Sequence, residues 1–345
     1  MHDRSGNLVS KPNGKILITG GDGLIGSALI WALNERGRDD IIVTGILGHG
    51  EKWKNLVALR FEDYLEADRL LESLDSSRLA DVSHIFHLGA CSDTTEKDCS
   101  YLIENNYEYT RRLAEWSLAR GKRFVYASSA ATYGDGSAGM RDGDQDLDLF
   151  RPLNMYGYSK QLFDVHAKRH GWLEHIVGLK YFNVFGPNEA HKGDMRSVVH
   201  KAFEQIRQKG SVKLFKSERP DYKDGEQKRD FFYVKDAVDA TIHLAFAPQA
   251  SGLFNLGSGI ASTWIELVTP IFDVLGLPLN IEFIDLPANL REKYQYYTCA
   301  DISRLLATGW SGPRFTLDKA VRDYVGQYLI PGLRLESDSR EVSVP

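Results

Sequence analysis

Cysteine is scarce in this sequence of 345 residues, which contains only Cys91, Cys99 and Cys299. The number is odd, and no two cysteines have the spacing of a metal-binding pair or of a disulfide framework. So few cysteines are typical of a chain kept in a reducing compartment. The sequence therefore predicts a cytoplasmic protein without structural disulfides, and it offers no metal site.

Long apolar runs and an excess of positive charge are also missing. No stretch reaches the roughly 18 consecutive apolar residues of a membrane-spanning helix, and the N-terminal residues lack the apolar centre of a signal peptide. The 42 basic and 47 acidic residues give a net charge of −5, without a basic stripe suited to nucleic acid. We therefore expect neither a membrane nor a nucleic-acid partner.

Hydrophobic residues make up 43% of the chain, enough for a sizeable core in one large or two moderate domains. The first organised segment is an apolar run, residues 15–19, followed by Gly20, Gly23 and Gly26 and then by apolar residues at helical spacing. The spacing G-x-x-G-x-x-G is a variant of the dinucleotide fingerprint, in which bare backbone lets a pyrophosphate approach the amides that open a helix. Two further apolar runs, residues 40–47 and 82–90, alternate with helical segments. This alternation predicts an α/β fold with a doubly wound parallel sheet of the Rossmann type.

The residue that usually selects the dinucleotide is absent. About 20 residues beyond the glycines an acid ordinarily binds the adenosine ribose hydroxyls, but the second predicted strand ends in Gly45. An acid there would repel a 2′-phosphate, whereas glycine does not, and Lys52 and Lys54 follow just downstream. We therefore expect NADP to bind with a modest preference over NAD, which stays the alternative. A solvated charged loop is the other interpretation of the two lysines.

A serine, a tyrosine and a lysine form a catalytic pattern. Ser129 ends a predicted strand, while Tyr156 and Lys160 are four residues apart on one face of a predicted helix, from which Tyr158 points elsewhere. A phenol with a pKa of about 10 needs a nearby ammonium to act as a base at neutral pH. Tyr156 would take a proton from a substrate alcohol while hydride moves to the cofactor, and Ser129 would bind the same oxygen. The alternative is a structural tyrosine beside a partly buried lysine.

Several stretches resemble those of a known family: "HLGACSDTTE", "NNYEYT", "YASSAATYG", "LNMYGYSK", "FNVFGPNEAHKG", "KRDFFYVKD" and "YQYYTCAD". From about residue 15 to about residue 328 the chain resembles the ADP-L-glycero-D-manno-heptose 6-epimerase family, a branch of the extended short-chain dehydrogenases/reductases. The glycine motif and Tyr-x-x-x-Lys are common to the whole superfamily, whereas "GACSDTTE" and "HKG" point to this branch. The resemblance implies an isomerase that inverts a carbon of a nucleotide sugar through a ketone, with a tightly held NADP.

The resemblance also implies roles for individual residues. Inversion returns hydride to the opposite face of the ketone, so a second acid/base is needed, and Lys192 in "HKG" matches it; a phosphate-binding or exposed cation is the alternative. Together with the glycine motif, the resemblance places cofactor contacts at Gly20, Gly23, Leu24, Ile25, Gly26, Lys52, Leu88, Gly89, Ala90, Cys91, Ser92, Asn105, Tyr156 and Lys160. It places substrate contacts at Asn183, Val184, Asp194, Phe215, Arg229 and Tyr294. Asp194 stands where the family usually has serine.

The predicted domains are not contiguous along the chain. The cofactor domain is expected in residues 15–180 and 229–279, and a smaller α/β substrate lobe in residues 181–228 and 280–328. A leader and a tail, residues 1–14 and 329–345, are expected to be flexible. Two segments that are longer than in the family, 134–150 and 216–228, are expected to border the substrate cleft, where they alter sugar or nucleotide preference or are tolerated surface loops.

Two other functions stay open on the sequence alone. A UDP-hexose 4-epimerase, or a related nucleotide-sugar epimerase, shares the fold and the Tyr-Lys pair but does not need the turn around Lys192. A non-catalytic dinucleotide-binding sensor would keep the fold, although the intact serine, tyrosine and lysine speak against it. A dehydratase is disfavoured, because Ala130 and Ala131 stand where that enzyme needs an acid. For the epimerase that the resemblance implies, which inverts C6 of ADP-glycero-manno-heptose, the partner is a nucleotide sugar of the ADP-heptose class, and we expect a homo-oligomer.

Overall fold

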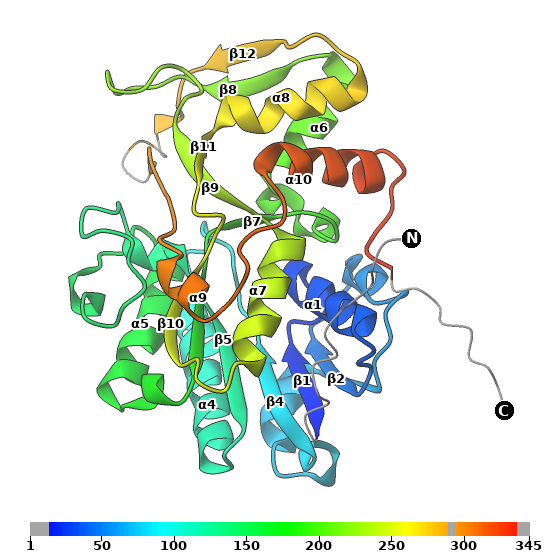
Figure 1. Cartoon of the computed structure of the whole chain (residues 1–345), viewed down its shortest axis with the longest axis vertical. Helices are drawn as coiled ribbons and strands as arrows, with labels where there is room; N and C mark the ends of the chain where they lie inside the picture. Colours follow the sequence, from blue (N-terminus) through cyan, green and yellow to red (C-terminus); the bar gives the residue numbers. More distant parts are fainter. Residues whose placement is uncertain (1–13, 289–290, 292–293, 337–345) are drawn as a thin grey trace, which may run out of the picture.

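The large sheet of the protein has seven parallel strands, in the spatial order β10-β6-β5-β4-β1-β2-β3 (Figure 1). The computed structural model describes residues 14–288, 291 and 294–336. The strands are β1 (Lys15–Thr19), β2 (Ile41–Gly45), β3 (Asp63–Glu66), β4 (Val82–His87), β5 (Arg123–Ser129), β6 (Val177–Tyr181) and β10 (Gly252–Leu256). The predicted doubly wound α/β fold is confirmed.

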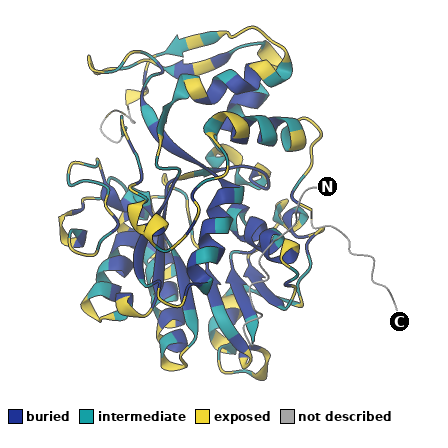
Figure 2. Cartoon of the chain, viewed as in Figure 1, coloured by how far each residue is buried: buried dark blue, intermediate teal, exposed yellow. Residues whose placement is uncertain are grey.

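Successive residues of the central strands face two separate apolar layers. In β1, Ile16 and Ile18 pack into one layer and Leu17 into the other. The first layer contains residues of α1 (Leu24–Glu35) and α7 (Val234–Phe246), and the second contains residues of α4 (Tyr109–Ala119) and α5 (Met155–Arg169). Because both faces are covered, the strands have continuous apolar sequences, and Figure 2 shows them as buried.

The strand order reverses beside β1, and this reversal positions the site. From β1 the chain continues to β2 and β3 on one side, whereas β4, β5, β6 and β10 follow on the other. Thr19 at the end of β1 is paired with His87 at the end of β4, so two strands that lead in opposite directions finish side by side. In doubly wound sheets the crevice outside such a switch point is where ligands bind.

A smaller lobe lies beyond the carboxyl edge of the large sheet, in the upper part of Figure 1. It contains a two-stranded parallel pair, β8 with β12, and a three-stranded sheet in the order β11-β9-β7. Its elements are β7 (Asn183–Phe185), α6 (Val198–Lys209), β8 (Val212–Phe215), β9 (Lys228–Tyr233), β11 (Ala261–Thr263), α8 (Trp264–Leu275), β12 (Ile281–Ile284) and α10 (Leu317–Tyr324). Short helices elsewhere are α2 (Ala67–Leu70), α3 (Cys99–Leu102) and α9 (Ser303–Ala307).

Two of the expected boundaries differ from this arrangement. Strands β9 and β11 and helix α8 fall almost entirely in the segment assigned to the cofactor domain, but they belong to the smaller lobe, where α8 packs with α6 and α10. Residues 329–336, expected in a flexible tail, are docked: Leu335 is buried, and its N–H donates to Asn188 Oδ1 at 3.0 Å. Residues 1–13 and 337–345, the rest of the expected leader and tail, lie outside the described residues.

Candidate active site

The glycine-rich loop after β1 is too crowded for side chains. Gly20 has φ +66°, and a Cβ atom on it would come within 2.7 Å of the backbone of Gly89. A Cβ on Gly26 would come within 2.1 Å of the Gly20 carbonyl oxygen. The loop therefore folds tightly under the N-terminus of α1, whose N-cap, Gly23, has no capping side chain and whose first turn has no acid. Such a terminus presents free amides and a positive dipole end to a phosphate.

The loop after β4 forms the opposite wall. Leu88 and Gly89 donate backbone N–H groups to Thr19, at 3.2 Å to its carbonyl and 3.0 Å to its hydroxyl oxygen. The side-chain amide of Asn106 holds Cys91, two residues after Gly89. The Cys91 N–H donates to Asn106 Oδ1, and Asn106 Nδ2 donates to the Cys91 carbonyl, both at 2.9 Å. The wall is therefore fixed through Asn106.

Sequence reasoning chose Asn105 for this wall, but Asn105 gives its side-chain amide to the Tyr101 carbonyl of its own helix. Asn106 is buried and also donates to Ser159 on α5, so it joins three segments. A π-helical turn, residues 103–108, lies between α3 and α4 here. Ala90 and Ser92 are exposed on the same loop.

Ser129 and Tyr156 are brought together by the close approach of α5 to the end of β5. A Cβ on Gly157 would lie 2.7 Å from the Ala131 carbonyl, so the first turn of α5 rests against the chain that leaves Ser129. Asn154 caps the helix by accepting the Gly157 N–H at 2.8 Å. Burial raises the pKa of Tyr156, and the neighbouring Ser129 hydroxyl acts in the opposite direction. The two predicted residues therefore face the same place.

Lys160, one turn after Tyr156, is buried. Its Nζ donates to the Ala127 carbonyl of β5 at 2.8 Å, and burial lowers its pKa to about 8. An ammonium with this pKa is mostly protonated at neutral pH, so its charge can favour a phenolate nearby. Tyr158 is 49% exposed and points away, as predicted from its place on the helix.

A buried polar network that the sequence did not reveal lies one turn further along α5. Asp164 accepts hydrogen bonds from Tyr126 and Ser128 of β5, at 2.8 and 2.7 Å, and from the Lys180 ammonium of β6 at 2.7 Å. The side chains of Asp164 and Lys180 are fully buried. The network fixes α5 to β5 and β6 beneath Ser129 and Tyr156. The four-residue spacing of positions 156, 160 and 164 on one helix face was the sequence signal that could have predicted it.

The turn that carries Lys192 is a short helical segment, Ala190–Met195, broken at Gly193 with φ +53°. Lys192 is half-buried, and desolvation lowers its pKa, whereas Glu189 acts in the opposite direction. Among the described residues its side chain makes no hydrogen bond to Ser129 or Tyr156. Asp194 is exposed at the end of the turn.

Asn55 connects this turn to the glycine-rich loop. Its Nδ2 lies 3.0 Å from the carbonyl oxygens of Asp22 and Asn188 and 3.1 Å from His191 Nδ1. Its Oδ1 accepts from Arg334 Nε at 3.2 Å. The turn of Lys192, the cofactor loop and the C-terminal segment are therefore held by one side chain that the sequence analysis did not single out.

The predicted substrate residues Phe215, Arg229 and Tyr294 form an aromatic enclosure around a guanidinium. Arg229 is buried, with its Cζ 5.3 Å from the ring centroid of Tyr294 and 5.7 Å from that of Trp264. Trp264 Nε1 donates to the Tyr294 hydroxyl at 3.1 Å, and Phe215 meets the Tyr294 ring edge-on. Burial lowers the pKa of Arg229. Trp264 was missed by sequence reasoning, because it begins a helix rather than a recognised motif.

The other two predicted substrate residues, Asn183 and Val184, begin β7. Asn183 is exposed and is paired with Phe231 of β9, two residues after Arg229. Ser129 is paired with Tyr181 of β6, two residues before Asn183. Strand pairing therefore connects Ser129, at the carboxyl edge of the large sheet, with Arg229 on β9 of the smaller lobe.

Three comparisons with known proteins agree with this geometry. The NAD dependent epimerase/dehydratase family model matches residues 16–257. A relative from Nitratidesulfovibrio vulgaris (strain DP4), named ADP-L-glycero-D-manno-heptose-6-epimerase, is 51% identical over 315 residues, which are 91% of this chain and 97% of the relative. A Fusobacterium nucleatum relative with the same name is 40% identical over 324 residues, 91% of this chain and 98% of its own. The chain belongs to the ADP-L-glycero-D-manno-heptose-6-epimerase family.

A solved structure of a family member supports the same assignment. The ADP-L-glycero-D-manno-heptose-6-epimerase of Helicobacter pylori has a TM-score of 0.78 and 28% identity, over 95% of this chain and 99% of that one. The protein is therefore an enzyme of the epimerase class that depends on a nicotinamide dinucleotide. The residues present fit that group, since the crowded glycines and the free α1 terminus follow β1, and Ser129, with Tyr156 beside it, follows β5 at the same carboxyl edge of the sheet.

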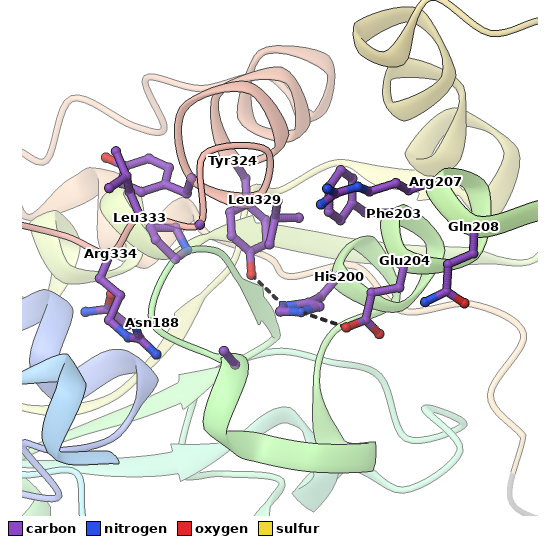
Figure 3. Close-up of a pocket in the computed structure, with 14 residues that line it drawn as sticks. Asn188, His200, Phe203, Glu204, Arg207, Gln208, Tyr324, Leu329, Leu333 and Arg334 are labelled. Atoms are coloured by element: carbon purple, nitrogen blue, oxygen red, sulfur yellow. Dashed lines mark hydrogen bonds and ion pairs between the residues drawn. The ribbon is translucent and has the colours of Figure 1, made fainter. Parts of the chain in front are cut away.

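Two cavities lie close to segments that carry predicted site residues. One of about 690 Å³ is lined by Tyr294 and by residues of both long segments, among them Arg141 and Tyr222. The other, of about 490 Å³, lies between α6 and the C-terminal segment, where His200 lies between Tyr324 and Glu204 (Figure 3). None of the predicted site residues lines the second cavity.

Neither a metal-binding cluster nor a membrane-spanning helix is found among the described residues. No group of three or more histidine, cysteine, aspartate or glutamate side chains suited to a metal ion occurs in the part of the chain that the structure describes. Within residues 14–288, 291 and 294–336, no helix has the length and apolar character needed to cross a membrane.

Proposed function

We propose that this protein inverts C6 of ADP-glycero-manno-heptose through a ketone intermediate. The observation that carries the proposal is the meeting of Ser129, Tyr156 and Lys160 at the switch point of a chain that is 51% identical to a protein named for this reaction. When bound, NADP or NAD would accept hydride from C6 and return it to the other face of the ketone. The amides at the start of α1 would bind the pyrophosphate.

Tyr156 is the base for the oxidation step. It takes the proton of the C6 hydroxyl, while Ser129 donates a hydrogen bond to the same oxygen. The Lys160 ammonium, held by the Ala127 carbonyl, lowers the cost of the phenolate. The buried Asp164–Lys180 network keeps α5 and this geometry in place.

Lys192 is the acid/base for the inverted orientation. After the ketone turns over, its oxygen no longer meets Tyr156, and a second proton donor must stand on the other side. Lys192 is half-buried, and desolvation lowers its pKa, so its ammonium gives up a proton more readily than that of an exposed lysine. The guanidinium of Arg229 binds the nucleotide diphosphate, and Tyr294 and Phe215 border the sugar nucleotide.

The proposal is tested with ADP-D-glycero-D-manno-heptose as substrate and NMR of the product at C6. We expect inversion at C6 and no conversion of UDP-galactose. Inversion of UDP-galactose at C4, with ADP-heptose unchanged, would identify a UDP-hexose 4-epimerase instead. Binding of dinucleotide without turnover of either sugar would identify a sensor.

Lys192→Met separates the second acid/base from a phosphate-binding cation. We expect turnover at saturating substrate to fall by roughly 10² to 10⁴-fold, with a smaller loss of nucleotide-sugar affinity by calorimetry. The exposed Lys54, which pairs with Glu51, provides the control Lys54→Met with unchanged turnover. Loss of binding with turnover at saturation preserved would assign Lys192 to the phosphates.

Two further properties are proposed from the sequence alone. We infer a cytoplasmic location from the scarcity of cysteine and a homo-oligomeric state from the family resemblance. Light scattering coupled to size-exclusion chromatography of the purified protein tests the second inference, and a single monomeric mass would contradict it.

A further inference from the structure

The carboxylate of Asp22 lies in the space that Gly45 leaves open at the end of β2. A Cβ atom built on Gly45 would come within 2.4 Å of Asp22 Oδ1. Asp22 itself belongs to the glycine-rich loop, between Gly20 and Gly23. The sequence reasoning found no acid at the strand end, but the fold supplies one to the same place from a different segment.

The buried carboxylate of Asp22 is incompletely satisfied among the described residues. The side chain is 3% exposed, and Oδ2 has no hydrogen-bond partner among the described residues. The neighbouring cation is Lys52, whose Nζ lies 3.5 Å from Oδ2 and donates to the Ile46 carbonyl at 3.2 Å. Burial raises the pKa of Asp22, and the Lys52 ammonium acts in the opposite direction. A buried acceptor that lacks a donor costs free energy, which indicates that a ligand supplies the donor.

Two residues beside the Asp22 carboxylate, Ile46 and Lys52, are partly open to solvent. Ile46 is 58% exposed, and the Lys52 side chain is 38% exposed. A ligand that enters at the carboxyl end of β2 can displace them without disturbing the core. The end of β2 is where the adenosine ribose of a dinucleotide lies when its pyrophosphate occupies the glycine-rich loop.

We propose that Asp22 replaces the missing strand-end acid and binds the adenosine ribose hydroxyls, while Lys52 is the counter-charge that admits a 2′-phosphate there. The inference rests on the proposed function, because it concerns the cofactor of that reaction. Ionised Asp22 accepts from the two hydroxyls of NAD and repels the 2′-phosphate of NADP, whereas Lys52 attracts that phosphate. The pair therefore sets the ratio of the two affinities.

Equilibrium dialysis of the full-length protein against NAD and against NADP tests the proposal. Asp22→Asn keeps the shape of the side chain, and we expect it to weaken NAD and to raise the ratio of NADP to NAD affinity by about tenfold or more. Lys52→Met should lower the same ratio by about fivefold. Lys319→Met, at an exposed position on α10 that has no predicted site role, should leave the ratio unchanged.

Each outcome decides the proposal. An unchanged ratio in a folded Asp22→Asn variant overturns the role of Asp22; if that variant does not fold, an unchanged ratio in Lys52→Met overturns the pair. Wild-type protein that binds neither dinucleotide rejects both this inference and the proposed function. Binding with the expected ratio changes, but without conversion of any nucleotide sugar, rejects the proposed function and supports the inference.

Discussion

Tyr156 is the single residue on which the proposed chemistry depends most directly. We expect Tyr156→Phe to fold and to bind dinucleotide, but to lose roughly 10² to 10⁴-fold in turnover, since the substrate hydroxyl then has no base. Epimerisation followed by NMR and dinucleotide binding by fluorescence are the measurements. Tyr158→Phe, two positions away and exposed, should keep full activity. Comparable activity of the two variants would remove Tyr156 from the mechanism.

The ionisation of His84 makes the stability of the fold depend on pH. Burial lowers its pKa to about 4, and its ring packs on Phe246 with centroids 4.8 Å apart. Between pH 6.5 and 4 the unfolded chain binds a proton at His84 that the folded protein does not bind, so this histidine destabilises the fold as pH falls. This destabilisation is absent above pH 6.5, where His84 is neutral in both the folded and the unfolded chain.

The variant His84→Phe lacks this titration and keeps the contact with Phe246. We therefore expect its free energy of unfolding, relative to wild type, to rise by up to about 1 kcal/mol per pH unit between pH 6 and 4.5. Urea denaturation at a series of pH values measures it. A difference that stays constant over this range would show that His84 ionises normally in the folded protein.

At the scale of elements, the attachment of α5 to β5 and β6 depends on the ion pair of Asp164 and Lys180. Removing either partner leaves a charge buried, which costs about 3 to 5 kcal/mol. We expect Asp164→Leu and Lys180→Met each to lower the free energy of unfolding by such an amount. The double variant should be more stable than the sum of the two losses predicts, because it buries no unpaired charge.

Denaturation of the four proteins in this cycle gives the coupling energy directly. The exposed pair of Arg322 and Asp318 provides a comparison, since a surface pair of this kind contributes about 1 kcal/mol or less. Additive losses for Asp164 and Lys180 would mean that the network does not hold α5 to the sheet.

At the scale of the whole molecule, the C-terminal segment ties the smaller lobe to the cofactor loop. Leu335 is buried, its N–H donates to Asn188, and Arg334 donates to Asn55. A chain that ends at Leu333 should lose about 1.5 to 3 kcal/mol of stability from the lost leucine alone. It should also lose activity, because Asn55 and Asn188 hold the turn of Lys192.

The matched control ends at Glu336 and keeps the docked segment. Thermal unfolding and epimerisation should be unchanged in this longer truncation. Equal stability of the two truncated proteins would mean that docking of residues 334–336 contributes nothing.

Local patterns in the sequence were sufficient to predict the fold class, the position of Ser129 at a strand end and the position of Tyr156 and Lys160 on one helix. Covered strands have continuous apolar runs, and the glycines are required wherever a Cβ atom would strike the backbone, as at Gly20 and Gly26. The four-residue spacing of Tyr156 and Lys160 places them on one helix face in any fold that contains the helix. These features depend on neighbours along the chain, and they are therefore readable in one dimension.

Other parts of the site were decided by contacts between distant segments. Asp22 reaches the end of β2 from another loop, Asn55 joins segments more than 130 residues apart, and Asp164 pairs with Lys180 across two elements. Asn106 is held against the loop of Cys91, 15 residues away, by two hydrogen bonds. Burial and charge pairing depend on which side chains meet after folding, and no local pattern encodes that meeting. The sequence alone therefore determined the fold class and the placement of Ser129, Tyr156 and Lys160 on their elements, whereas the tertiary structure decided which polar groups support them.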